Sequence, residues 1–123
     1  IVFNNLFIDW SSDVIIVEGA FDAIRVGSNA IPILGSTLRE DSELFKKIVL
    51  NDASVFIALD PDAEKKSLEI IYKLLTYDVE LYKIEVGPYT DVGEMPREVF
   101  IKRKRDAKRM NIDEYIIHQA NNI

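Results

Sequence analysis

Short runs of apolar residues recur along the chain and alternate with segments of helical spacing. The apolar runs cover residues 14–17, 30–34, 54–59 and 79–84. The first three are almost continuously hydrophobic, which is typical of parallel strands that are covered on both faces. All four are rich in Val, Ile, Leu, Phe or Tyr and are short. The pattern therefore predicts four buried β-strands.

The segments between these runs predict helices. Residues 63–77 have apolar side chains at the i, i+3, i+4, i+7 spacing of a half-buried helix, with charged side chains on the other faces. These apolar positions are Leu68, Ile71, Tyr72 and Leu75. Residues 41–50 carry a similar stripe, and Thr37 with Glu40 could form a capping box before it. Residues 20–27 supply the first helical connection.

Strands that alternate with helices require right-handed crossovers and hence an α/β fold. We expect a doubly wound, Rossmann-like sheet of about four parallel strands flanked by helices. In such a sheet the functional crevice lies outside the carboxyl ends of the strands. Residues 1–10 could add a flanking strand, and the last twenty-two residues look like one helix or two.

Composition narrows the class of protein. The chain has 123 residues and a formal net charge of −6, with 48% hydrophobic residues, which fits one packed domain. It contains no cysteine and one histidine, His118, so disulfides, thiol nucleophiles and cysteine-ligated zinc are excluded. No apolar run approaches a membrane span, and no targeting segment is visible. We expect a cytoplasmic protein, and, since position 1 is Ile, an excerpt or processed product of something longer.

Charge is distributed unevenly. Residues 1–101 hold nine basic and eighteen acidic residues, whereas residues 102–123 hold six basic and three acidic residues. We therefore divide the chain into an acidic domain, 1–101, in which any catalytic site would lie, and a basic C-terminal helical extension, 102–123. The basic run at 102–109 could follow a nucleic-acid backbone, or it could be a solvated helix face that pairs with the acidic body. We favour the second interpretation because such runs are common. Aromatic residues are not interleaved there, so stacking on single-stranded bases has no support.

Acidic side chains follow three of the four predicted strands. Glu18 ends the first strand, Asp60 and Asp62 follow the third, and Asp91 follows the fourth after a short loop. Asp22 lies one helical turn beyond Glu18. If the strands are parallel, these carboxylates meet at one edge and repel one another unless a cation binds. A set of oxygen ligands without cysteine suits Mg²⁺ or Mn²⁺.

Each acid also has a simpler interpretation. Asp62 could cap the following helix, Asp60 could be a turn residue, Asp22 a solvated helix acid and Asp91 part of a loop. Glu18 is the hardest to explain in this way, because a carboxylate directly after a fully apolar strand is unfavourable unless it has a use. Taken together, the acids indicate a site.

Two motifs carry a resemblance to a known family. Residues 14–24 hold an apolar strand closed by Glu18-Gly19 with Asp22 four residues after the Glu, and this segment resembles the first motif of the Toprim domain. Asp60-Pro61-Asp62 after an apolar strand resembles the second, Asp-x-Asp motif. The spacing, with Leu-Gly-Ser-Thr-Leu at 34–38, is similar to DNA primases of the bacterial and phage type.

The resemblance implies a function and a role for each acid. Asp60, Asp62 and Asp91 would hold Mg²⁺ or Mn²⁺, Glu18 would bind metal or move a proton, and Asp22 would belong to or support the metal set. The activity would be nucleotidyl transfer, in which ribonucleoside triphosphates are joined into RNA primers on a single-stranded DNA template. The zinc-binding domain of the family, and any replicative helicase, would lie in another segment or chain. A phage-encoded protein would act in the host cytoplasm.

The strand ends also offer phosphate contacts. Backbone amides around Gly19 and Gly35 and the hydroxyls of Ser36 and Thr37 could contact phosphate groups. The chain departs from the usual primase pattern at two places. Pro61 stands where these primases have Gly, and the third motif keeps only its first acid, Asp91.

Two alternatives remain open. The first is a Toprim nuclease or topoisomerase-type module that cleaves strands with the same metals. The second is a non-catalytic, acidic, receiver-like domain, which would need a Lys at the end of a later strand. Lys83 is a poor candidate for that residue.

Overall fold

The computed structural model describes residues 8–35 and 37–121. No helix in these two ranges is long and apolar enough to cross a membrane. The elements, which include two short 3-10 helices named η2 and η3, follow one another in the order β1 (Val14–Val17), α1 (Ala20–Val26), β2 (Ala30–Pro32), α2 (Glu43–Leu50), β3 (Ser54–Ala58), η2 (Pro61–Ala63), α3 (Glu64–Thr76), β4 (Glu80–Lys83), η3 (Val92–Glu94), α4 (Arg97–Asp106) and α5 (Ile112–Ala120).

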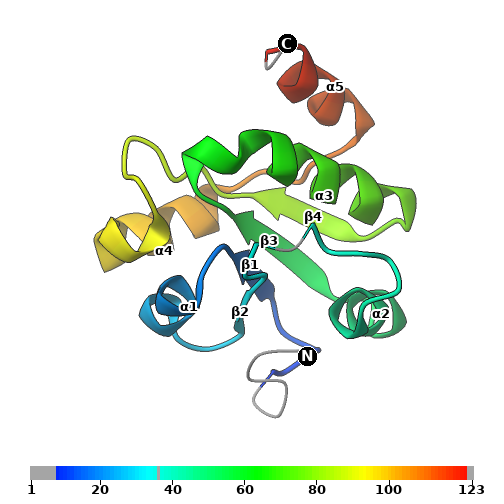
Figure 1. The fold of residues 1–123 in the computed structure, drawn as a ribbon, viewed down its shortest axis with the longest axis horizontal. Helices are drawn as coiled ribbons and strands as arrows, with labels where there is room; N and C mark the ends of the chain where they lie inside the picture. The colour runs from blue at the N-terminus through cyan, green and yellow to red at the C-terminus, as the bar shows by residue number, and fades with distance from the viewer. Residues whose placement is uncertain (1–7, 36, 122–123) are drawn as a thin grey trace.

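The four strands form one parallel sheet in the order β2-β1-β3-β4, as the sequence predicts (Figure 1). The chain moves outward from β1 to β2 and then returns to the other side of β1 to form β3 and β4. The strand order therefore reverses between β1 and β3. Ligands of open α/β sheets bind at such a reversal, outside the carboxyl ends of the two strands.

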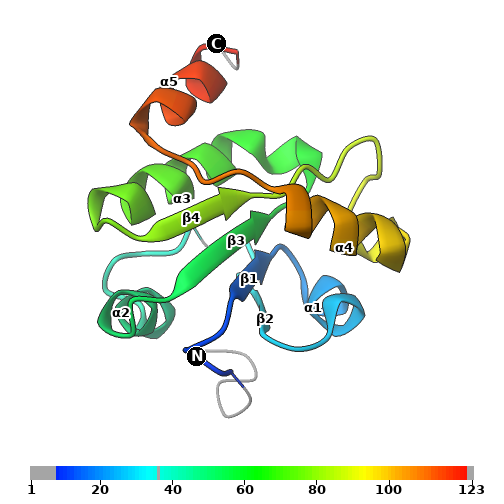
Figure 2. The ribbon, with the colours of Figure 1, turned by 180° about the vertical axis from the view of Figure 1, so that it is seen from behind.

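Helices cover both faces of the sheet (Figures 1 and 2). Alternate side chains of β1 point to opposite faces, so Val14 and Ile16 belong to one buried cluster and Ile15 and Val17 to another. The first cluster includes side chains of α2 and α3, and the second includes side chains of α1 and α4. Burial on both faces explains why the strands read as continuous apolar runs, and it confirms the doubly wound α/β fold.

Several element ends differ from the sequence predictions. The capping box of Thr37 and Glu40 is wrong, because α2 begins later and its cap is Ser42, whose Oγ accepts a hydrogen bond from the Phe45 amide at 3.2 Å. The strand predicted over 30–34 ends at Pro32, although the Ile33 amide still donates to the Val17 carbonyl at 3.0 Å. Two residues later Leu34 has a φ of 52°, so the backbone has left the extended conformation.

Two expectations concern the ends of the chain: a flanking strand in residues 1–10 and a division of the chain after residue 101. Of the segment expected to add a flanking strand, residues 1–7 lie outside the described part, and residues 8–10 are not in a strand. The proposed division at residue 101 falls within α4, whose Phe100 is buried in the core. After α4, the chain crosses to α5, which lies beside α3 (Figure 2). The two helices pack through Tyr72 and Tyr115, whose ring centroids lie 5.5 Å apart.

Candidate active site

The site is centred on the ends of β1 and β3, the two strands between which the sheet order reverses. Val17 and Ala58 are register partners, Glu18 directly follows Val17, and Asp60 follows Ala58 by two residues. The parallel register of β1 and β3 thus brings the two acids to the same edge of the sheet. Together with Asp62 they line an open hollow of about 560 Å³.

Glu18 and Asp60 each have a carboxylate oxygen without a partner. Among the side chains that the structure describes, the buried polar atoms with no hydrogen-bond partner are Glu18 Oε1 and Asp60 Oδ1. The other Glu18 oxygen, Oε2, accepts a hydrogen bond from Lys66 Nζ at 2.7 Å. Buried carboxylate oxygens without partners are unfavourable, and a hard cation is the ligand that would satisfy them. The donor set therefore fits Mg²⁺ or Mn²⁺.

The electrostatic field of the other acids reaches Asp60. Burial, followed by the charges of Asp22, Glu18, Asp62 and Asp91, raises the pKa of Asp60 from 3.8 to about 6. All five predicted acids are therefore close enough to interact at this edge. In the side-chain positions observed, however, no three His, Asp or Glu groups among the described residues surround a common point as ligands of one ion would.

The raised pKa of Asp60 predicts a pH dependence of stability in metal-free buffer. Because the folded protein binds this proton more tightly than the unfolded chain, the stabilisation is complete below about pH 4 and is lost as the pH rises through about 6. The variant Asp60→Asn has no carboxyl group at this position, so its stability should not fall in this way as the pH rises. We expect its free energy of unfolding, relative to the natural chain, to increase by about 1–2 kcal/mol between pH 4 and pH 8, since solvent access reduces the full effect.

Urea unfolding in EDTA at several pH values would measure this difference. The other acids are common to both proteins, so the difference between the two curves reports Asp60 together with its coupling to them. A difference that stays constant from pH 4 to pH 8 would show that Asp60 titrates normally.

Asp22 is the most buried of the acids and holds two backbone segments together. Only 7% of this residue is exposed. Its Oδ2 accepts from the Gly19 amide at 3.2 Å, and its Oδ1 accepts from the Gly93 amide at 3.0 Å. Asp22 thus links the turn after β1 to η3, and the close approach leaves little room at Gly93, where a Cβ would lie 3.1 Å from the ring of Phe21.

Asp91 and Asp62 are more accessible. Asp91 caps η3, because its Oδ1 accepts from the Glu94 amide at 2.9 Å. Asp62 lies exposed within η2 and does not form a side-chain cap of α3, so the simple capping interpretation does not apply to it. Metal binding by Asp62 and by Asp91 stays a prediction.

Of the residues expected to contact phosphate, Gly19 follows β1 and Gly35 follows β2 at this edge. The Gly19 amide already donates to Asp22. The Leu34 amide donates to the Glu18 carbonyl at 3.0 Å, which places the start of the loop after β2 beside Glu18. Gly35 follows with a φ of 84°, Ser36 lies outside the described residues, and the Thr37 carbonyl accepts from Lys73 Nζ at 3.1 Å. Phosphate binding by these residues stays a prediction.

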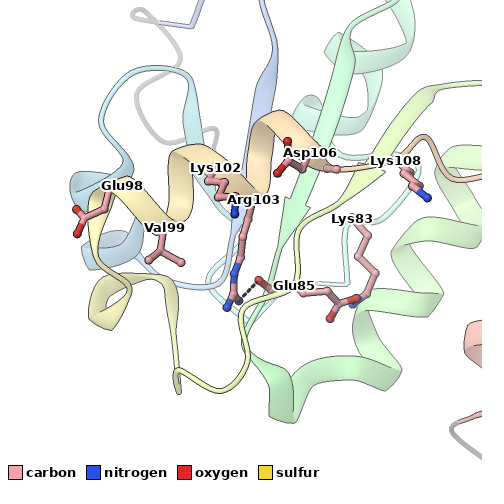
Figure 3. Close-up of a pocket in the computed structure, with 9 residues that line it drawn as sticks. Lys83, Glu85, Glu98, Val99, Lys102, Arg103, Asp106 and Lys108 are labelled. Atoms are coloured by element: carbon pink, nitrogen blue, oxygen red, sulfur yellow. Dashed lines mark hydrogen bonds and ion pairs between the residues drawn. The ribbon is translucent and has the colours of Figure 1, made fainter.

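The basic run 102–109 is partly used within the fold (Figure 3). Arg103 donates to the backbone carbonyls of Glu85 at 2.7 Å and Gly87 at 2.6 Å. Lys104 pairs with Asp13 at 2.8 Å and lies 4.3 Å from the ring centre of Phe56. These contacts agree with the interpretation that the run pairs with the body. Lys102, Arg103 and Lys108 also line a hollow of about 840 Å³ beside β4.

Sequence reasoning missed Lys66. Helical spacing places Lys66 among the charged side chains outside the apolar stripe of α3. Its side chain nevertheless reaches the end of β1 and is only 22% exposed. The available signal was its position four residues after Asp62, which places it one helical turn further along the face that begins at the second acidic motif.

Comparison with known proteins identifies the fold. No protein-family model and no curated protein matches the chain. The chain is similar to the crystal structure of the Aquifex aeolicus primase, which contains its zinc-binding and RNA polymerase domains, with a TM-score of 0.67 and 21% sequence identity. The chain has a primase-like fold. The match covers 87% of this chain and 31% of the primase chain, so the primase-like fold corresponds to about a third of that structure.

Proposed function

We propose that this chain is the catalytic domain of a DNA primase, of the Toprim type, and that it transfers nucleotides with the help of Mg²⁺ or Mn²⁺. The observation that carries the proposal is the pair Glu18 and Asp60, whose carboxylates meet where the sheet order reverses and keep unpartnered oxygens there. The primase-like fold supports the same assignment.

The chain's own residues would act as follows. Glu18, Asp60 and Asp62 would hold the divalent ions, with Asp91 at the side of the site and Asp22 fixing the backbone between them. When bound, such ions neutralise charge on the phosphates and on the attacking and leaving oxygens. The hydroxyl of the growing strand would attack the α-phosphate of a ribonucleoside triphosphate, and pyrophosphate would leave. Glu18 could accept the proton of that hydroxyl if it does not bind metal.

This chain matches only about a third of the Aquifex aeolicus primase chain, so we also propose which substrates and additional domains act with it. We infer that single-stranded DNA and ribonucleoside triphosphates are the substrates. A zinc-binding domain, which the Aquifex aeolicus primase structure contains, or a helicase would be supplied by another segment or chain.

The receiver-like alternative lacks structural support. A receiver needs its strand-end lysine beside the phosphate-accepting aspartate. Here Lys83 pairs instead with Glu64 at 3.2 Å and Glu85 at 3.0 Å.

Two measurements test the proposed function. The first is the titration of the chain with Mn²⁺, followed by the electron paramagnetic resonance signal of the free ion, and we expect saturable binding. The second is incorporation of labelled ribonucleotides on a single-stranded DNA template by the gene product that carries this chain, with and without EDTA. Metal-dependent nicking of DNA without ribonucleotide incorporation would favour the nuclease alternative, and the absence of Mn²⁺ binding would contradict both.

A further inference from the structure

Lys66 brings a positive charge into the acidic edge of the sheet. It lies in the first turn of α3, and its Nζ is 2.7 Å from Glu18 Oε2. Both side chains of this pair are only 22% exposed. The pair joins residues 48 positions apart in the sequence, so it links α3 directly to the end of β1.

The pair satisfies only part of the negative charge. Lys66 contacts one oxygen of Glu18, while Glu18 Oε1 and Asp60 Oδ1 keep no hydrogen-bond partner. One ammonium group therefore balances a carboxylate that the other acids also repel. Lys65 lines the same hollow but is exposed, and no ion pair involves it in the described part of the chain.

We propose that Lys66 is an internal counter-ion of the candidate metal centre, which neutralises Glu18 until a divalent cation replaces it there. The inference rests on the proposed function, because it concerns the same site. A lysine ammonium is a compact charge on a flexible stem, so it can leave Glu18 without any movement of the backbone. A divalent ion and the ammonium compete for the same carboxylate, so Lys66 lowers the affinity of the site and limits metal binding to ions of sufficient charge.

The competition predicts that removal of the lysine tightens metal binding. For Lys66→Met we expect the dissociation constant of Mn²⁺ to fall about tenfold, because one positive charge near a divalent ion has been deleted. Lys66→Arg keeps the charge and should remain within about threefold of the natural chain. Lys65→Met removes an equal charge from the same hollow, but without an ion pair to Glu18, and should change the constant by less than about threefold.

The change of thermal unfolding on addition of Mn²⁺ supplies a second readout that a merely structural lysine would not affect. In EDTA, Lys66→Met should melt below the natural chain, because Glu18 has lost its partner. Saturating Mn²⁺ should reduce or reverse this difference, since tighter binding stabilises the variant more. Lys66→Gln, which keeps a polar group beside Glu18, serves if the methionine variant does not fold.

The outcomes separate this inference from the proposed function. If the natural chain binds Mn²⁺ and Lys66→Met binds it equally or more weakly, the counter-ion role is wrong and the metal centre stands. An equal gain for Lys65→Met and Lys66→Met would also overturn it, because the effect would then come from the general charge of the hollow. If neither the natural chain nor any variant binds Mn²⁺, both the counter-ion role and the metal centre are wrong.

Discussion

Asp60→Asn should lower metal-dependent ribonucleotide incorporation on the order of a thousandfold, while the protein remains folded. Asparagine has nearly the shape of aspartate, so it should fit at the carboxyl end of β3. It lacks the negative charge, so it is a poor ligand for a divalent ion. The unpartnered Oδ1 atom at this position is one of the two observations that indicate a cation site. Removing the charge also relieves the repulsion that raises the pKa of Asp60.

The expected pattern is loss of activity with equal or greater stability. Activity would be measured as labelled ribonucleotide incorporation by the gene product that carries this chain, and stability by urea unfolding in EDTA. Asp52→Asn is the matched control, because Asp52 is exposed in the turn before β3 with a φ of 51°, a conformation that asparagine readily adopts. Asp52→Asn should change the activity by less than about twofold and the free energy of unfolding by less than about 0.5 kcal/mol. Retention of activity by Asp60→Asn would remove Asp60 from the reaction.

The sheet was predictable because its strands are buried on both faces. A run such as Val-Ile-Ile-Val at β1 has no polar face, and only a covered parallel strand suits it. The strand ends were less predictable because local geometry sets them. The strand β2 ends at Pro32, two residues before Leu34 takes a φ of 52°, and Ser42 caps α2 five residues after Thr37, the cap that the sequence suggested. Several polar residues in that segment could each serve as a cap, and only the path of the loop selects one.

The candidate site was predictable where the backbone alone determines it. Parallel strands bring Glu18 and Asp60 to one edge, and the spacing along the chain was sufficient for that inference. The contacts of long side chains were not predictable. Lys66 meets Glu18 through the packing of α3 on the sheet, and Asp22 meets Gly93 through the fold of a loop 71 residues away. Neither partner can be read from helical spacing.

Asp22→Ala should destabilise the protein by about 2–3 kcal/mol and loosen the loop that carries Asp91. Asp22 is buried, with 7% of the residue exposed, and its carboxylate accepts from the amides of Gly19 and Gly93. Its removal leaves two backbone donors without their charged acceptor. Hydrogen bonds to charged groups contribute more than neutral ones, which sets the magnitude. Relief of the repulsion between Asp22 and Asp60 offsets part of this loss.

Three measurements distinguish this positioning role from a purely electrostatic one. Urea unfolding gives the change in stability, and hydrogen exchange should show faster exchange of the Gly93 amide, because η3 is no longer tied to α1. NMR titration should show a lower pKa for Asp60 in Asp22→Ala, since a neighbouring charge is gone. Asp41→Ala is the control, because Asp41 pairs on the surface with Arg39 and should change stability by less than about 0.5 kcal/mol. Unchanged protection of Gly93 would mean that η3 is held by its apolar contacts alone, and Asp22 would then act at this edge only through its charge.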